Sequence, residues 1–434
     1  MRRKRGFGVL LLAALMVMVV AQTSFGAGFA LYEGSARGNA LGGAMVGRAD
    51  DPSALFYNPA GITQLPGMQF MAGATFIMPS TNVNTYQGGV WRSTGTEDNV
   101  WFPPHMYATY QFNDSLWFGL AAFSPFGLGT EFDSNWVGRY NNYEAVIQTL
   151  TLNPNVAYKI TDKLSAAAGV DFMYFDITYK KKIPGYTQLT TPISMRNPLL
   201  DSDVSLEGDS WGYGWNVGLH YKALDWMSLG LAYRSEVGQH IHGTADFAKS
   251  MYSNYPATFY NDTDASAKVT LPAELFMGVN FKILPQLTWE VGAIWTQWSS
   301  YQELKVKFDQ PVAYLSNGTA ITTDTATKKY KDVWRINTGL EYKALDWLDL
   351  RLGYVWDQEP SRDEYADYLV PASNRHMITS GLGFHWNNWT FDVSYTYLII
   401  EGRSVFNSLA NGVLASTFED GDAHLVGVSV SYKF

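Results

Sequence analysis

Large apolar residues alternate with small or polar residues along most of the chain from residue 67 onward. In residues 211–221 every odd position carries Trp, Tyr, Val or Leu, and every even position carries Gly, Asn or His. Residues 389–397 and 426–434 show the same alternation. A period of two residues is typical of a β-strand. Since one face is aromatic and aliphatic and the other is small and polar, the pattern predicts strands between lipid and a polar lumen.

Short and long connections alternate between these segments. The short turns lie near residues 113–114, 161–163, 224–225, 284–286, 345–346 and 387–388. The long polar connections lie near residues 80–100, 124–145, 183–209, 244–266, 309–330, 358–372 and 402–420. Outer-membrane barrels have short periplasmic turns and long extracellular loops. The connections delimit fourteen strands, near residues 67–79, 101–112, 115–123, 146–160, 164–182, 210–223, 226–243, 267–283, 287–308, 331–344, 347–357, 373–386, 389–401 and 421–434.

The composition favours a membrane wall over a soluble β-sandwich. Aromatic residues make up 15% of the chain and charged residues only 16%, whereas a soluble sandwich exposes more charge on its outer face. No long uninterrupted apolar run follows residue 26, which excludes a helical membrane protein. We therefore predict an all-β transmembrane fold, a 14-stranded antiparallel outer-membrane β-barrel over residues 67–434 that closes with the strand ending at Phe434.

Residues 1–26 have the composition of a cleaved signal peptide. Arg2, Arg3, Lys4 and Arg5 precede an apolar run from Val9 to Ala21, and small residues stand three residues and one residue before Ala27. The apolar run is too short to span a membrane comfortably. Its removal leaves 27 Lys and Arg against 40 Asp and Glu, a net charge of −13. A chain this acidic is a poor partner for nucleic acid.

Residues 27–66 differ from the rest of the chain because they are rich in Gly and Ala and lack the two-residue alternation. A segment of small residues ahead of a barrel predicts a hatch, or plug, in the lumen. The segment ends in Asn58, Pro59 and Ala60, a rigid Asn-Pro turn. We predict that this turn is the hatch gate and that it touches ligand or the barrel wall where the wall is interrupted.

Charged residues occur at strand positions that alternate with the aromatic ones, so we expect them to face the lumen. They are Asp171, Arg234, Glu274, Glu290, Arg335, Glu341, Asp349, Arg351 and Asp392. Charges facing lipid are costly, and charges facing water or each other are tolerated. For most of these residues we favour a structural ion-pair network. The alternative is that one or two of the arginines bind an anionic head group.

The third predicted strand meets a break at Ser124, Pro125, Phe126 and Gly127. Proline cannot donate a hydrogen bond to a strand ladder and is confined to edges, strand starts and bulges. A break at this point would kink or open the barrel wall. The alternative is that the strand simply ends and an outer loop begins, and residue chemistry alone does not decide between the two.

Several segments together resemble the long-chain fatty-acid outer-membrane transporter family, FadL, with its aromatic-hydrocarbon branch TodX. The segments are residues 27–31, 35–51, 58–61, 124–130, 136–140 and 152–158, and they occur in the family's order over the whole mature chain. The resemblance implies a monomeric barrel with an N-terminal hatch. It implies that a hydrophobic ligand is captured by the outer loops and leaves sideways through a wall gap at residues 124–127. Apolar loop residues, namely Phe126, Leu128, Trp136 and Tyr140, are candidates for a first ligand groove, and packing of the loop over the barrel mouth is the alternative.

The resemblance favours long-chain fatty acids as substrates, with aromatic hydrocarbons or alkanes as the alternative. The expected surroundings are outer-membrane lipid and lipopolysaccharide. An enzyme is not favoured, because the sequence contains no HExxH, no cysteine and no G-x-S-x-G motif, and we expect neither a cofactor nor a metal. A general porin would lack a hatch and would give steady conductance.

Overall fold

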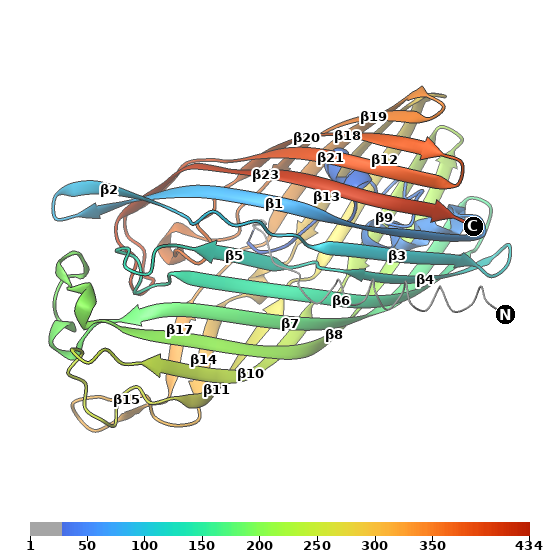
Figure 1. Cartoon of the computed structure of the whole chain (residues 1–434). Helices are drawn as coiled ribbons and strands as arrows, with labels where there is room; N and C mark the ends of the chain where they lie inside the picture. The colour runs from blue at the N-terminus through green and yellow to red at the C-terminus, as the bar shows by residue number, and fades with distance from the viewer. Residues whose placement is uncertain (1–27) are drawn as a thin grey trace, which may run out of the picture.

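The computed structural model describes residues 28–434, so the predicted signal peptide lies outside the described residues. Fourteen antiparallel spans form a closed barrel, in which the first span pairs with the last (Figure 1). The spans are β1 (Met68–Gln87), β3 (Pro104–Gln111), β4 (Leu116–Phe123) with β5 (Gly127–Glu131), β6 (Glu144–Lys159), β7 (Leu164–Ile183), β8 (Ser202–Leu224), β9 (Met227–Arg234) with β10 (Val237–Ala248), β11 (Thr263–Leu271) with β12 (Glu274–Leu284), β13 (Leu287–Thr296) with β14 (Glu303–Phe308), β18 (Val333–Leu345), β19 (Leu348–Asp357), β20 (Arg375–Trp386), β21 (Trp389–Ile400) and β23 (Ser416–Lys433). The predicted barrel is confirmed.

The loops carry short elements of their own. These are β2 (Val90–Gly95), η3 (Tyr186–Gln188), η4 (Ile193–Met195), η5 (Pro198–Leu200), η6 (Trp298–Ser300), β15 (Ala313–Tyr314), β16 (Ala320–Ile321), β17 (Thr323–Thr327), η7 (Asp363–Tyr365) and β22 (Arg403–Val405). No helix within residues 28–434 is long and apolar enough to cross a membrane.

The predicted alternation is visible on the outer face. Trp211, Tyr213 and Trp215 of β8 are at least half exposed, and the residues between them are buried. A row of exposed aromatic side chains on a barrel wall is the surface that lipid covers. The strand pattern in the sequence therefore reports correctly which side chains face outward.

Three predicted strands are interrupted where the sequence analysis expected continuous ones. Residues 235–236 separate β9 from β10, residues 272–273 separate β11 from β12, and residues 297–302 separate β13 from β14. Pro272 has no N–H to donate to the ladder. At residues 297–302 the chain turns through η6. Because the regular ladder is interrupted at three places, the loop-side half of this wall is irregular.

Parts of several predicted loops are strand instead, including extensions of three barrel spans. β1 continues to Gln87, β8 begins at Ser202 and β23 begins at Ser416. The extension of β1 pairs with β2 on one edge and with β23 on the other. Pairing between these extensions satisfies backbone groups that an isolated loop would leave to water, so the barrel wall continues beyond the predicted strand ends.

Residues 28–66, called here the N-terminal segment, contact inward-facing residues of strands far apart in the barrel. The segment contains α2 (Ala36–Ala40), α3 (Ala54–Tyr57) and η2 (Pro59–Gln64). Its backbone donates to Ser429 of β23 and to Glu290 of β13, and Asn58 donates to the Leu219 carbonyl of β8. The segment therefore lies within the barrel, as the blue ribbon of Figure 1 also shows.

Wall glycines allow the backbone of the segment to approach closely. A Cβ atom on Gly230 would lie 1.9 Å from the Val46 carbonyl oxygen, and one on Gly339 would lie 2.5 Å from the Leu41 carbonyl oxygen. Any larger residue at these two positions would collide with the segment. The small residues on the inner face of the wall thus make room for the segment.

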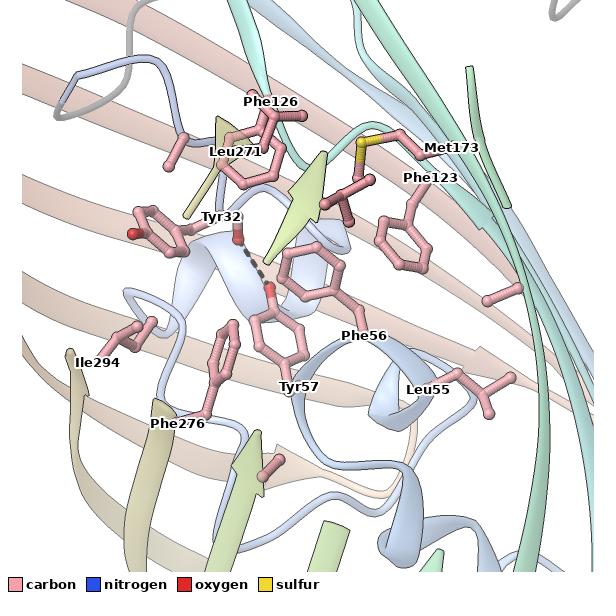
Figure 2. Packing of buried hydrophobic residues seen from close by; sticks show 14 of the residues in the cluster. Tyr32, Leu55, Phe56, Tyr57, Phe123, Phe126, Met173, Leu271, Phe276 and Ile294 are labelled. Atoms are coloured by element: carbon pink, nitrogen blue, oxygen red, sulfur yellow. Dashed lines mark hydrogen bonds between the residues drawn. The ribbon is translucent and has the colours of Figure 1, made fainter. Parts of the chain in front are cut away.

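An apolar cluster joins the middle of the segment to the wall (Figure 2). Phe56 of α3 makes edge contacts with Phe123 at 5.1 Å and with Phe276 at 6.3 Å between ring centroids. The Tyr57 hydroxyl donates to the Tyr32 carbonyl at 3.2 Å, so the two halves of the segment are also joined to each other. Aromatic edge pairs add stability beyond the area they bury.

Candidate functional site

A chamber of about 270 Å³ lies at the loop end of the lumen. Its wall is largely apolar and includes Ile177, Leu206, Ile241, Ala267, Leu304 and Val306. The loops that close it bring in Tyr140 and Tyr365. A concave, mostly apolar space with a few polar groups is typical of a site for small hydrophobic molecules.

Two lysines line the chamber, and each is paired with a carboxylate. The Lys181 amine lies 2.5 Å from Asp324, and the Lys328 amine pairs with Asp367. Burial lowers the pKa of Lys328, but the Asp367 carboxylate and the Tyr301 hydroxyl together raise the pKa above its usual value. The Lys328 amine is therefore charged at neutral pH, and its charge is balanced by Asp367.

A second, narrower recess of about 10 Å³ adjoins the chamber toward the middle of the barrel. The two spaces share Ile177, Tyr179 and Leu304. The recess is also lined by Leu128 and Phe29, the latter from the N-terminal segment. The apolar lining is therefore continuous from the loop end of the lumen to the first residues of the segment.

The wall is interrupted beside this recess, where β4 ends at Phe123 and β5 begins at Gly127. β4 pairs with both β3 and β6, whereas the strand ladder within residues 28–434 pairs β5 with β6 alone. The chain thus resumes as a strand after residues 124–126. The Trp101 ring packs against Gly129 on the side of β5 that lacks a ladder partner.

The first residues of the N-terminal segment pair with this break. The Leu31 N–H donates to the Pro125 carbonyl and the Gly127 N–H donates to the Phe29 carbonyl, both at 2.8 Å. Ala30 and Phe126 form an isolated antiparallel bridge between these two bonds. Residues 29–31 therefore act as a short additional strand at the interruption.

Phe29 is held between the break and η6 on a different part of the wall. Its ring makes edge contacts with Trp298 at 4.7 Å, Tyr301 at 5.6 Å and Phe126 at 6.3 Å between centroids. Gly28 has φ +62°, and a Cβ atom there would lie 2.6 Å from the Trp298 ring. The sequence analysis did not identify Trp298, because nothing near it in the sequence marks it as more than a wall aromatic.

The Asn-Pro turn lies elsewhere, which corrects the expectation that it would touch the wall break. The Asn58 side chain donates to the Val46 and Leu219 carbonyls, each at 3.0 Å, and accepts from the Ala60 N–H. Asn58 and Pro59 pack against Gly218 of β8. The chain passes through α3 before this turn, and the turn faces β8 and β9. The part of the segment that contacts the wall break is residues 29–31.

The four candidate groove residues do not form one groove. Phe126 packs with Phe29, and Leu128 lines the recess. Trp136 stacks on Phe132 at 4.1 Å in a separate apolar cluster under the loops, and Tyr140 lines the chamber while its hydroxyl bonds to Asp201 at 3.0 Å. Proximity in the sequence grouped residues that the fold separates.

The candidate lumenal arginines all have carboxylate partners. Arg234 lies 2.5 Å from Asp171, and Arg335 lies 3.1 Å from Asp357. The third, Arg351, contacts a carboxylate group made of Glu341, Asp349 and Asp392, at distances of 2.5 to 3.4 Å. Glu274, another of the candidate lumenal charges, is also buried.

Glu341 also binds the N-terminal segment. Arg37 makes two contacts with it at 2.7 and 2.8 Å, and Arg48 makes one at 2.9 Å. The adjacent Glu290 accepts from the Gly47 and Arg48 amides at 2.8 Å. Such charges need a partner of opposite sign, since an unpaired charge in a low dielectric is costly. This cluster fixes the periplasmic half of the segment to the wall.

Residues 17–434 match the family described as outer membrane protein transport protein (OMPP1/FadL/TodX). The chain belongs to this family. A "Long-chain fatty acid transport protein" of Escherichia coli O6:H1 is 28% identical over 97% of each chain. The family places the barrel in the bacterial outer membrane as a transport protein, so the resemblance inferred from the sequence is confirmed.

Two solved structures have the same fold as this member of the family. A FadL homologue of Pseudomonas aeruginosa superposes with a TM-score of 0.80 at 20% identity, covering 94% of this chain and all of the other. The toluene transporter TodX of P. putida superposes with a TM-score of 0.70 at 19% identity, covering 92% and 98%. At this identity the two comparisons establish the fold alone.

Proposed function

We propose that this protein takes up hydrophobic molecules, foremost long-chain fatty acids, by passive capture and lateral release through the wall at residues 124–127. The ligand enters the chamber from the loops and moves into the recess. It then displaces residues 28–31 and leaves toward the bilayer interior. An apolar molecule gains nothing from a water-filled channel, whereas this path keeps it among apolar side chains.

The observation that carries this proposal is the pairing of residues 29–31 with the wall break. Two backbone hydrogen bonds and three aromatic edge contacts hold this short stretch. The ring of Phe29 lines the recess that a ligand would fill. A hydrophobic ligand in the recess would compete for the same aromatic surfaces, so its arrival favours the release of residues 28–31. In this proposal residues 28–66 act as the hatch of a monomer, and no chemical step is needed.

A switchable covalent lock tests the proposal. Ala30 and Phe126 form the non-hydrogen-bonded type of antiparallel pair, the type with the closest Cα atoms, which suits a disulfide. The chain has no native cysteine. In the double variant Ala30→Cys with Phe126→Cys, we expect uptake of a labelled fatty acid to stop under oxidising conditions and to return after reduction.

The single variants Ala30→Cys and Phe126→Cys serve as controls, because neither can form the lock. Their uptake should not respond to the redox conditions. Equal uptake by the oxidised and reduced forms of the double variant, with the disulfide verified by mass, would show that residues 28–31 need not leave the break. A second test restores a regular strand with Pro125→Val and Gly127→Thr, which should block uptake in a barrel that still assembles.

Aromatic hydrocarbons or alkanes are the second candidate substrates, and one observation favours them. Both lysines of the chamber are already neutralised by Asp324 and Asp367, so a fatty-acid carboxylate would meet no free cation there. Competition between a labelled fatty acid and toluene for the purified protein separates the two candidates. The variant Asp324→Asn frees Lys181 and should tighten fatty-acid binding about tenfold, in the range of a charge-assisted contact, without changing toluene binding.

A further inference from the structure

Five basic side chains form an outward-facing cluster on the loop-side half of the barrel wall, called here the basic patch. It comprises His240, His242, Lys268, Lys305 and Lys307. All five are exposed, and the residues that alternate with them, such as Ile241 and Val306, line the chamber inside the barrel. The basic patch is therefore on the opposite side of the wall from the ligand path.

The strand register brings these residues together. His240 of β10 pairs with Lys268 of β11, and Ser266 of β11 pairs with Lys307 of β14. The ladder between β11 and β14 covers only three residue pairs. Beyond it the two strands separate, which leaves a hollow of about 320 Å³ bounded by the five basic residues.

The charges of the basic patch are unbalanced within the protein. Lys180, Lys181 and Lys182 on β7 are each paired with a carboxylate. In contrast, no side chain of the basic patch has a hydrogen bond or an ion pair to any of residues 28–434. Among the residues that line the hollow, Glu303 is acidic, and Asp209 lies opposite His242 at the edge of the patch. Like charges placed across neighbouring strands repel, and charge on the outer face of a barrel is costly, so an external anion would stabilise the patch.

The height of the patch on the wall indicates which anion this is. The outward aromatic row on β8 ends at Trp211, and the next outward residue toward the loops, Asp209, pairs in register with His242. Exposed Trp and Tyr side chains mark the boundary between hydrocarbon and head groups. The basic patch therefore faces the head-group layer of the outer leaflet, where lipopolysaccharide carries its phosphates.

We propose that the basic patch is a binding site for the phosphorylated lipid A part of lipopolysaccharide. The ammonium groups of Lys268, Lys305 and Lys307 bind a phosphate in the hollow, and His240 and His242 border it. Bound lipopolysaccharide brings the missing negative charge to the irregular part of the wall, between β11 and β14. The site is independent of the proposed transport path, so each can fail without the other.

The affinity of the full-length protein in non-ionic detergent for lipopolysaccharide tests this site. The variant K268Q/K305Q/K307Q should bind about 100- to 200-fold more weakly, given the usual contribution of each lysine near an anionic lipid surface. The matched control K163Q/K282Q/K433Q removes three exposed lysines that also lack ion pairs, at the periplasmic end, and should change the affinity by less than about twofold. Wild-type protein should lose its preference when the lipid A is dephosphorylated.

Three results would overturn the proposal. The first is a patch variant that binds lipopolysaccharide as tightly as the wild type, and the second is an equal loss of affinity in the control variant. The third is that the wild type binds phosphatidylglycerol as tightly as lipopolysaccharide and that the patch variant loses this binding. The last result would assign the patch to any anionic lipid. Heat-modifiable migration on gels and unchanged fatty-acid binding verify that the variant barrel is folded. If the triple variant does not fold, K305Q alone should weaken binding about fivefold, and unchanged binding by it would equally reject the site.

Discussion

The two ends of the N-terminal segment are attached to the barrel by different forces. Toward the periplasm, Arg37 and Arg48 bind the partly buried carboxylate of Glu341, and the buried Glu290 accepts from two backbone amides. At the wall break, two backbone hydrogen bonds and the contacts of one phenyl ring hold residues 28–31. An apolar ligand can replace aromatic contacts but cannot replace an arginine or a carboxylate. The difference suggests that a ligand frees one end while the other stays fixed.

The largest effect should come from removing the shared carboxylate at the fixed end. Glu341→Gln leaves Arg37, Arg48 and Arg351 without a common partner, which costs about 3–5 kcal/mol for a buried ion pair broken on one side. We expect the whole segment to loosen and planar bilayers to show steady channel openings. Asp346→Asn, in an exposed periplasmic turn, is the control. A silent Glu341→Gln channel would mean that the network does not hold the segment.

Phe29→Ala should weaken only the attachment of the N-terminal segment at the wall break. It removes three aromatic edge contacts, each worth about 0.5–1.5 kcal/mol. Residues 28–31 should leave the break more often, so uptake should be faster at low ligand concentration while conductance stays near zero. The measurement is the initial uptake rate of a labelled fatty acid by whole cells. A rate equal to or below that of the wild type would argue against release at this end as the slow step.

Asn58→Ala should have a smaller effect, and it should loosen the periplasmic end of the N-terminal segment. The change removes three hydrogen bonds of the Asn58 side chain, two donated and one accepted, each contributing about 0.5–1.5 kcal/mol. We expect faster proteolysis around residues 58–64 in the purified protein and a modest change in uptake. If uptake instead stopped completely, the Asn-Pro turn would be a gate in its own right, as the sequence first suggested.

Gly28→Ala should have the smallest effect and should separate backbone strain from ring contacts. A non-glycine residue at φ +62° costs about 1–2 kcal/mol, and its Cβ atom would press on the Trp298 ring. The variant should therefore resemble Phe29→Ala in direction with a smaller gain in uptake rate. A slower rate would show that the added methyl group tightens the contact with Trp298 instead.

The sequence allowed the barrel to be predicted because lipid and lumen impose opposite demands on successive residues. Pro125 allowed the strand interruption to be predicted, because the lack of a backbone N–H in proline is known from the sequence alone. The contact of Phe29 with Trp298 was not predictable, because it joins the start of the chain to a wall irregularity that has no sequence signature. Lys181 and Asp324, which are 143 residues apart, meet only once the register of the barrel is fixed.

Amide hydrogen exchange of the purified protein, with and without a fatty acid, tests the unequal attachment most directly. The Leu31 and Gly127 amides report on the wall break, and the Gly47 and Arg48 amides report on the fixed end. We predict that ligand speeds exchange at Leu31 and Gly127 and leaves Gly47 and Arg48 protected. Unchanged protection at the break, or an equal loss of protection at both ends, would contradict the account.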